Sequence, residues 1–371
     1  MTQPKQGPIP PIPLTVITGF LGAGKTTLLN RLLQDPDLAD TIVIVNEFGA
    51  IGLDHLLMET VADGMVLLQS GCLCCTIRGD LLNTLEGLLR KRDNARIMAF
   101  RRVLIETTGL ADPAPILQLL MAHPYLGLRY RLEGVVTLVD AVNGLATLDS
   151  QPEAVKQVAM ADRLVLTKQD LAGPNQAIAS ILHDLNPTAP ILDGKTASPA
   201  DLLDCGLYDP ATKSPDVKRW LQDEALLARL GQNAHRHTDG SLHVETGSTG
   251  ASAQPGKQAK GQDSRDINRH DASIRAHAFA TQTAIRTESF ALFQDVLRAA
   301  HGPKLLRLKG IVKLAESPEN PVIIHGVQHV FHPPVILDRW PDADRRTRLV
   351  FITKDLDPAF VEGLWTAFLG T

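Results

Sequence analysis

The sequence predicts an α/β protein in which a doubly wound sheet precedes a second, smaller α+β domain. Two observations carry this prediction. Between residues 14 and 205, short apolar runs alternate with stretches of helical spacing, a pattern typical of parallel βαβ units. The composition turns polar after residue 231, and apolar periodicity returns only at residue 273. The chain of 371 residues is long enough for two or three domains with substantial cores.

The elements expected in the first domain follow one another along the chain. Apolar runs predict strands over 14–18, 41–45, 103–105, 135–139 and 164–166. Apolar residues at helical spacing predict helices over 26–33, 80–90 and 115–121. Ligands of such sheets bind at the carboxyl ends of the strands, so the residues that follow each strand are the candidate site.

Polar stretches mark the domain boundaries. Residues 1–13 are rich in proline and predict a disordered tail, which leaves the first domain over 14–230. Residues 231–272 hold only three large apolar side chains, too few to offset the entropy of ordering, and predict a flexible linker that contains histidines. The second domain then covers 273–371. Its apolar patterns predict strands over 274–283, 305–314, 322–324 and 348–353, a helix near 290–300 and a last helix over 358–368.

Composition excludes several classes of protein. A formal net charge of −4 and an aromatic share of 4% argue against a nucleic-acid binder. There is no run of 18 apolar residues, which argues against a membrane helix, and the first residues lack the apolar core of a signal peptide. Four cysteines are too few for a disulfide scaffold. Together these features predict a cytoplasmic protein.

A phosphate-binding loop is the strongest motif. Residues 19–26, GFLGAGKT, match the pattern G-x-x-x-x-G-K-[ST] and lie between a predicted strand and a predicted helix. Such glycines let backbone N–H groups surround a phosphate at a helix N-terminus. Lys25 would reach the β- and γ-phosphates, and the Thr26 hydroxyl would bind Mg²⁺. The predicted nucleotide-binding residues here are Gly19, Gly22, Ala23, Gly24, Lys25, Thr26 and Thr27.

Two later strand ends supply further candidates. Glu106 ends an apolar strand, where a carboxylate can hold Mg²⁺, and Gly109 could place a backbone N–H near the γ-phosphate. Thr167, Lys168 and Asp170 form a T-K-x-D sequence after another strand. The Asp170 carboxylate could accept hydrogen bonds from the guanine N1–H and N2 amine, a pair that adenine does not offer. The sequence therefore favours GTP over ATP, although the usual motif begins with Asn.

Three clustered cysteines are the most distinctive feature. Cys72, Cys74 and Cys75 stand in a C-x-C-C sequence, and thiolates are soft ligands that favour Zn²⁺ or Cu⁺. A structural zinc site usually has four protein ligands, so an open site for transient metal binding is expected. Redox chemistry and three small buried side chains are the alternatives. Cys205 is alone and has no predicted role.

The histidines leave two interpretations open, a metal-binding role and a structural or solvated one. Those in the linker are His235, His237, His243 and His270. In the second domain His325, His329 and His332 lie close together, and strand spacing would place His325 and His329 on one face. His55 is an additional candidate ligand.

Taken together, these residues resemble the CobW family of P-loop GTPases, relatives of the nickel-insertion GTPases of hydrogenase and urease maturation. The matching stretches lie at 15–33, 45–54, 71–81, 106–113, 167–170, 305–312 and 348–353. The resemblance implies a P-loop NTPase domain followed by the C-terminal domain of the family.

The resemblance also implies a function, a GTP-hydrolysing metallochaperone for a client metalloprotein. Lys25, Glu47 and Glu106 would be catalytic, with Glu47 in a switch segment over 46–54. The three cysteines would carry the cargo ion, Zn²⁺ in many members and Co²⁺ in the cobalamin branch. GTP, GDP, Mg²⁺ and a second copy in a homodimer are the other implied partners. A metal buffer or sensor with little turnover stays open, as does a P-loop kinase.

Overall fold

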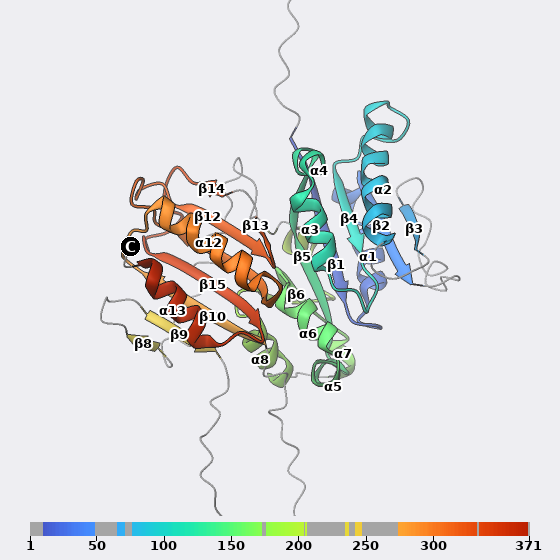
Figure 1. The fold of residues 1–371 in the computed structure, drawn as a ribbon. Coiled ribbons are helices and arrows are strands. Elements are labelled where there is room, and N and C mark those ends of the chain that lie inside the picture. The colour runs from blue at the N-terminus through green and yellow to red at the C-terminus, as the bar shows by residue number, and fades with distance from the viewer. Residues whose placement is uncertain are drawn as a thin grey trace, which may run out of the picture.

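The structure is a computed structural model, and it describes residues 10–48, 65–70, 76–172, 176–203, 205, 234–236, 242–246, 274–331 and 334–369. The chain forms two sheets that lie side by side, each with its own helices (Figure 1). In the described residues no helix has the length and apolar character needed to cross a membrane.

The first domain is built on a parallel sheet of seven strands in the order β3-β2-β4-β1-β5-β6-β7. The strands are β1 (Ile12–Gly19), β2 (Thr41–Phe48), β3 (Met65–Ser70), β4 (Arg102–Glu106), β5 (Tyr130–Asp140), β6 (Arg163–Thr167) and β7 (Ile191–Asp193). All six neighbouring pairs are parallel. The chain builds one half of the sheet beside β1 and then crosses to the other half, so the switch point of the fold is at β1.

Helices cover both faces of this sheet. They are α1 (Lys25–Leu32), α2 (Thr76–Asp93), α3 (Ala114–Ala122), α4 (Pro124–Arg129), α5 (Gly144–Ser150), α6 (Pro152–Ala159), α7 (Gln169–Ala172), α8 (Gln176–Leu185) and α9 (Pro199–Leu203), with a short 3₁₀ turn at Pro36–Leu38. Successive strand residues point to opposite faces. Ile42 and Ile44 therefore pack in one apolar core with α2, α3, α6 and α8, and Val43 packs in a second core with α1 and α9. The doubly wound fold is confirmed.

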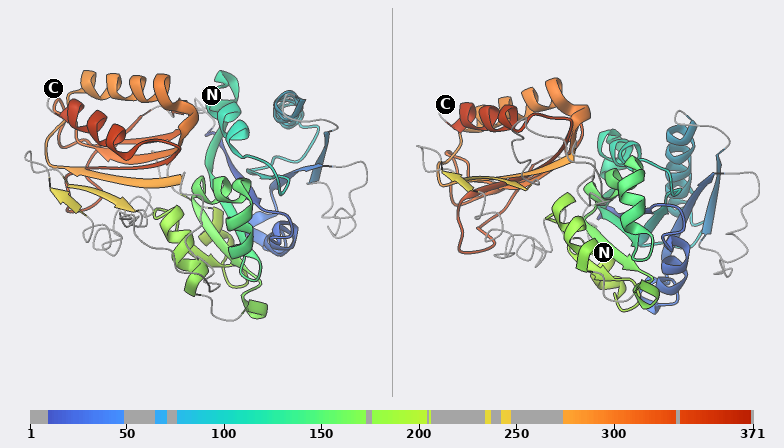
Figure 2. Two further views of the ribbon diagram at one scale, coloured as in Figure 1. Left: turned by 60° about the horizontal axis from the view of Figure 1, so that its bottom comes forward. Right: turned by 90° about the horizontal axis from the view of Figure 1, so that it is seen from below.

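The second domain is an antiparallel sheet in the order β13-β12-β11-β15-β10-β9-β8, with β14 paired to β12. Its elements from residue 274 are β10 (Ile274–Thr281), α12 (Thr287–His301), a 3₁₀ turn at Gly302–Lys304, β11 (Leu305–Val312), β12 (Val322–Val327), β13 (Val330–Phe331), β14 (Val335–Ile336), β15 (Thr347–Lys354) and α13 (Pro358–Leu369). Helices α12 and α13 cover the face turned away from the first domain (Figure 2). Under them the rings of Phe279, Phe293, Phe351 and Trp365 contact one another. The predicted α+β domain is confirmed.

Two boundaries differ from the prediction. Strand β1 already begins at Ile12, inside the expected tail 1–13. Two strands, β8 (Ala234–Arg236) and β9 (Leu242–Thr246), lie inside the expected linker 231–272. Strand β9 pairs with β10 from Leu242 to Thr246 and extends the antiparallel sheet. An edge strand can be held by backbone hydrogen bonds to its neighbour, so it needs fewer apolar residues than a central strand.

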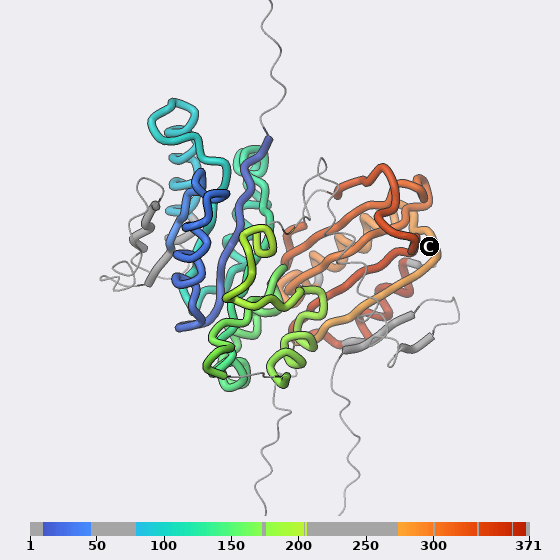
Figure 3. Tube along the Cα trace, turned by 180° about the vertical axis from the view of Figure 1, so that it is seen from behind, coloured from blue at the N-terminus to red at the C-terminus, as the bar shows by residue number. Residues whose placement is uncertain are grey.

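The other face of the antiparallel sheet packs against the first domain, as the front and back views show (Figures 1 and 3). Five apolar residues of the second domain join the core formed by α3, α6 and α8; they are Ile274, Ala276, Leu306, Val327 and Ile352. From the middle of α3, Gln118 Nε2 donates to Gln328 Oε1 at 2.5 Å. The two domains therefore share one apolar core.

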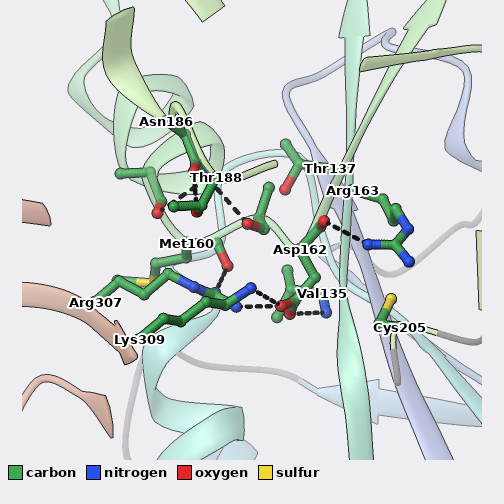
Figure 4. Close-up of polar contacts among 12 residues, drawn as sticks. Val135, Thr137, Met160, Asp162, Arg163, Asn186, Thr188, Cys205, Arg307 and Lys309 are labelled. Carbon is green, nitrogen blue, oxygen red and sulfur yellow. Dashed lines mark hydrogen bonds and ion pairs between the residues drawn. The ribbon is translucent and has the colours of Figure 1, made fainter. Parts of the chain in front are cut away.

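A buried ion cluster lies within this shared interface (Figure 4). Oδ1 of Asp162 accepts hydrogen bonds from the Arg307 guanidinium and, at 2.5 Å, from Lys309 Nζ. Its Oδ2 accepts from the Val135 backbone N–H at 2.9 Å, and Arg307 also donates to the Met160 carbonyl. Each of the three charged side chains is at most 5% exposed.

The titration behaviour of the cluster follows from burial and neighbouring charge. Burial alone would raise the pKa of Asp162, but the charges of Arg307 and Lys309 hold the pKa of that carboxyl well below its ordinary value. Burial and the charge of Arg307 lower the pKa of Lys309 to about 8, against the opposing effect of Asp162. The carboxylate is thus the counter-charge on which two buried cations depend.

We expect Asp162→Asn to destabilise the protein by about 3–5 kcal/mol, because the substitution leaves two buried cations without a counter-charge. Urea denaturation followed by circular dichroism measures the change. Glu319→Gln is the matched control, since Glu319 pairs with Arg345 on the surface and both side chains are at least 60% exposed. Glu319→Gln should lower the free energy of unfolding by less than about 1 kcal/mol. Equal small losses in both variants would contradict the prediction.

Candidate functional site

The phosphate loop joins β1 to α1 and has the backbone that its sequence predicts. Gly24 has φ of 87° and stands directly before α1, in the left-handed region that favours glycine. Gly19 has φ of 141°, and a Cβ there would lie 2.5 Å from the Leu138 carbonyl oxygen. The glycine at position 24 has no side chain that could cap α1, so the first N–H groups of the helix can receive an anion.

Lys25 is folded back over this loop. Its Nζ donates to the carbonyl of Gly19 at 2.9 Å and to that of Phe20 at 3.2 Å, and the residue is 9% exposed. The ammonium therefore lies among the loop atoms, in the position from which such a lysine reaches bound phosphates.

Thr26 and Glu106 are brought together although 80 residues separate them. Thr26 Oγ1 donates to Glu106 Oε1 at 3.0 Å, since α1 begins beside β1 and β4 is the neighbour of β1 in the sheet. Glu106 is only 5% exposed. Hydroxyl and carboxylate oxygens are the ligands that Mg²⁺ prefers, so this pair fits the ion that the sequence implies.

The segment after β4 lies directly against the phosphate loop. A Cβ at Gly109 would be 2.6 Å from the backbone nitrogen of Leu21, so no larger residue fits without a shift. The start of the segment is tied to β1, where the Thr107 N–H donates to the Ile17 carbonyl at 3.0 Å and Thr107 Oγ1 donates to Thr18 Oγ1 at 2.7 Å. Gly109 is thus placed where its backbone borders the phosphate loop, as predicted.

The T-K-x-D residues reach the same edge of the sheet. Thr167 Oγ1 donates to the Ala23 carbonyl at 2.8 Å, so the threonine that replaces the usual Asn bonds to the phosphate loop. Lys168, with φ of 57°, places its Nζ 2.8 Å from Asp140 Oδ2. Asp170 lies in α7 with a carboxylate that is 45% exposed.

Two residues at this site were missed by the sequence analysis. Asp140 ends β5, and its position after the apolar run 135–139 is the same signal that identified Glu106. Lys195 follows β7, a strand of three residues that is too short to recognise. Its Nζ lies 3.0 Å from Asp170 Oδ2, and this hydrogen bond lowers the pKa of the Asp170 carboxyl. Asp170 is therefore ionised and available to accept hydrogen bonds at neutral pH.

Most of the predicted ligands for the transition metal ion lie outside the described residues. This holds for Cys72, Cys74 and Cys75, for the switch residues from 49 onward with His55, and for His237, His270 and His332. Glu47 is in β2, where its backbone is opposite Gln69 of β3. Strand β3 ends at Ser70, at the same sheet edge as the phosphate loop. Among residues that the structure describes, no group of three or more His, Cys, Asp or Glu could hold a metal ion.

The structure describes the backbone or the surroundings of four further histidines and of the fourth cysteine. His235 and His243 lie opposite each other in β8 and β9. His325 is buried in β12, whereas His329 is in the turn before β13, so the prediction of one shared strand face is wrong. Gln328 has φ of 53° and ends the strand between them. Cys205 is buried against Gly134, and burial raises the pKa of its thiol. It is a small core side chain.

Comparison with known proteins agrees with this geometry. Residues 13–193 match the family described as CobW/HypB/UreG, nucleotide-binding domain, and residues 274–369 match the cobalamin synthesis protein cobW C-terminal domain. The chain belongs to the CobW family. The two matched segments correspond to the parallel-sheet domain and the antiparallel-sheet domain, and together they cover most of the chain.

Individual relatives include proteins with zinc in their names. The zinc chaperone YjiA of Escherichia coli is 42% identical over 181 residues, which are 49% of this chain and 57% of YjiA. The zinc chaperone CobW of Pseudomonas aeruginosa is 28% identical over 94% of this chain and 89% of its own. The zinc-regulated GTPase metalloprotein activator 1 of Schizosaccharomyces pombe is 32% identical, and the match spans half of its length. The crystal structure of Zn(II)-bound YjiA GTPase superposes with a TM-score of 0.67 at 25% identity, over 97% of this chain and 99% of that chain.

We expect Gly109→Ala to destabilise the protein by about 1–3 kcal/mol, because the added methyl group would overlap the Leu21 backbone. Gly87→Ala in α2 is the matched control. A Cβ at Gly87 meets nothing within 4 Å, and replacing a helical glycine by alanine should raise the free energy of unfolding by about 0.5–1 kcal/mol. Urea midpoints measure both changes. If both substitutions shifted the midpoint in the same direction, the close contact would be refuted.

Proposed function

We propose that this chain is a GTPase that binds a transition metal ion, Zn²⁺ in the first instance, and transfers it to a client protein. The observation that carries the proposal is the meeting of three nucleotide-binding features at one sheet edge in a member of the CobW family. These are the phosphate loop, the Thr26–Glu106 pair and the T-K-x-D residues that end at Asp170. Membership of a family whose relatives are named zinc chaperones and zinc-regulated GTPases supports the choice of metal.

Each residue at this edge has a role in hydrolysis that follows from its position. The N–H groups of the phosphate loop and Lys25 bind and orient the β- and γ-phosphates. Thr26 and Glu106 would hold Mg²⁺, which neutralises charge on the phosphates when bound. The backbone N–H of Gly109 would donate to the γ-phosphate, because Gly109 borders the phosphate loop. Glu47, the residue before the end of β2, would position the attacking water.

The base is selected by Asp170. An ionised carboxylate accepts from both guanine N1–H and the N2 amine, and the hydrogen bond from Lys195 lowers the pKa of Asp170 further below its ordinary value. The stem of Lys168 would cover the base, with its Nζ held by Asp140.

The metal would be carried by the thiolates of Cys72, Cys74 and Cys75. Soft thiolate ligands favour Zn²⁺ over harder oxygen-preferring cations, and Co²⁺ is the alternative cargo. The segment between β2 and β3 links the nucleotide edge to these cysteines along the chain. A nucleotide-dependent change in that segment would alter metal affinity, and by linkage the metal would alter nucleotide affinity by the same factor.

We expect Asp170→Asn to weaken GTP binding by about 100-fold, because a charged acceptor of two hydrogen bonds is lost. The asparagine amide should instead match xanthine, which presents a carbonyl at C2, so xanthosine triphosphate should now compete. Competition against a fluorescent GDP analogue measures both affinities. Asp193→Asn at the end of β7 is the control and should keep the preference for guanine. Equal binding of GTP and ATP by the unaltered protein would refute the base assignment.

We expect Zn²⁺ affinity to differ between the protein bound to a non-hydrolysable GTP analogue and the protein bound to GDP. Competitive titration with a chromogenic chelator under reducing conditions measures it. Cys74→Ser should lower Zn²⁺ affinity by tenfold or more, since a thiolate ligand is removed. Cys205→Ala is the matched control and should leave Zn²⁺ binding unchanged, because that thiol is buried in the core. Unchanged binding in Cys74→Ser would eliminate the cysteine site, and turnover that neither metal nor client stimulates would favour a metal buffer.

A further inference from the structure

A buried glutamine on α6 holds the segment that follows β4. Gln157 has no exposed surface, and its Nε2 donates to the carbonyl of Gly109 at 3.1 Å and to that of Ala111 at 3.0 Å. One side-chain amide therefore bridges two carbonyls of the segment that carries the proposed γ-phosphate donor. Nothing in the sequence marks Gln157, because its partners are 46 and 48 residues away.

Two further polar contacts tie α6 to the segment after β4 and to the central sheet. Lys156 Nζ lies 3.3 Å from Asp112 Oδ2, so two consecutive residues of α6 hold the same segment. The main-chain carbonyl of Gln157 accepts from Thr137 Oγ1 of β5 at 2.8 Å. The position of the amide is thus set by the central sheet, and the amide in turn sets the position of the segment.

A cavity adjoins this contact. Its volume is about 260 Å³, and it lies between the phosphate loop, the end of β5 and the helices α5 and α6. Its walls include Phe20 and Leu21 of the loop, Leu148 of α5, and Ala154, Gln157 and Val158 of α6. Oε1 of Gln157 has no hydrogen-bond partner in the described part of the chain, so its two Nε2 bonds are what orient the amide. Helix α6 therefore holds the segment after β4 through the polar contacts of Gln157 and Lys156.

We propose that Gln157 is a positioning residue for GTP hydrolysis. By fixing the carbonyls of Gly109 and Ala111, it holds the Gly109 backbone N–H against the phosphate loop, where that N–H meets a γ-phosphate. This inference rests on the proposed GTPase activity. GDP has no γ-phosphate, so the residue acts on turnover and on the binding of GTP analogues and leaves GDP binding unchanged.

The test is Gln157→Glu, which keeps the shape of the side chain but removes both N–H donors. Two lost hydrogen bonds of about 1 kcal/mol each correspond to a fall in kcat of about 10- to 30-fold. Single-turnover GTP hydrolysis measures the rate, and fluorescence titration with labelled GDP measures an affinity that should stay within about twofold. Gln157→Met removes the donors without adding charge, and it should lower kcat to a similar degree.

Asn186→Asp is the matched control. Asn186 is also a fully buried amide, and its Nδ2 donates to the carbonyls of Val158, Ala159 and Ala161, at the carboxyl end of α6 and just beyond it, without contacting the segment after β4. Gln157→Glu and Asn186→Asp should both lower the melting temperature. Asn186→Asp should nevertheless retain kcat when the rates are compared at the same folded fraction. A normal kcat in both Gln157 variants, or an equal loss of kcat in Asn186→Asp, would overturn the positioning role. Failure of the unaltered protein to bind GTP would instead refute the proposed function.

Discussion

The arrangement of the two domains depends on one buried carboxylate. Asp162 stands at the start of β6, accepts from the backbone of β5 and is the counter-charge for Arg307 and Lys309 of β11. Removing charges from water is costly, so each of these groups requires the others to remain buried. The first domain alone would expose Asp162, and the second domain alone would present two cations on a sheet face that also carries His325. The ion cluster thus makes the two sheets a single structural unit, with the shared apolar core packed around it.

Strand β6 connects the buried ion cluster to the phosphate loop. Strand β6 leads from Asp162 at the domain interface to Thr167, whose hydroxyl bonds to the Ala23 carbonyl of the phosphate loop. Helix α6 ends just before Asp162 and carries Gln157, which holds the segment after β4. Two short elements therefore connect the antiparallel sheet to the parts of the site that would contact phosphates and base. These contacts tie the part of the site that adjoins the second domain to the shared interface.

Local patterns predicted much of this structure, and long-range contacts account for what they missed. Apolar runs located five of the seven parallel strands, and the spacing of glycines located the phosphate loop, because both signals lie within a few residues. The partners of Asp162 are about 145 residues away, so no local pattern reveals them. Strand β8 was missed because an edge strand is held by its one neighbour, and β9 because it is held between β8 and β10. The turn at Gln328 was missed because no glycine or asparagine marks its left-handed residue. At the nucleotide site, Asp140 could have been predicted from its position after a strand, whereas Gln157 could not.

The strand order also separates the strand that precedes the cysteine sequence from the interface with the second domain. Strand β3, which leads to the cysteine sequence, is at the end of the parallel sheet and pairs with β2 alone in the described residues. The strands that adjoin the ion cluster, β5 and β6, are on the other side of β1. Displacing an edge strand breaks one ladder of hydrogen bonds, whereas displacing a central strand breaks two. On the proposed function, a change at the γ-phosphate that displaces β3 would therefore break fewer hydrogen bonds than one that displaces β5 or β6, and it would leave the buried charges at Asp162 in place. Strand β1, the switch point of the sheet, separates these two regions.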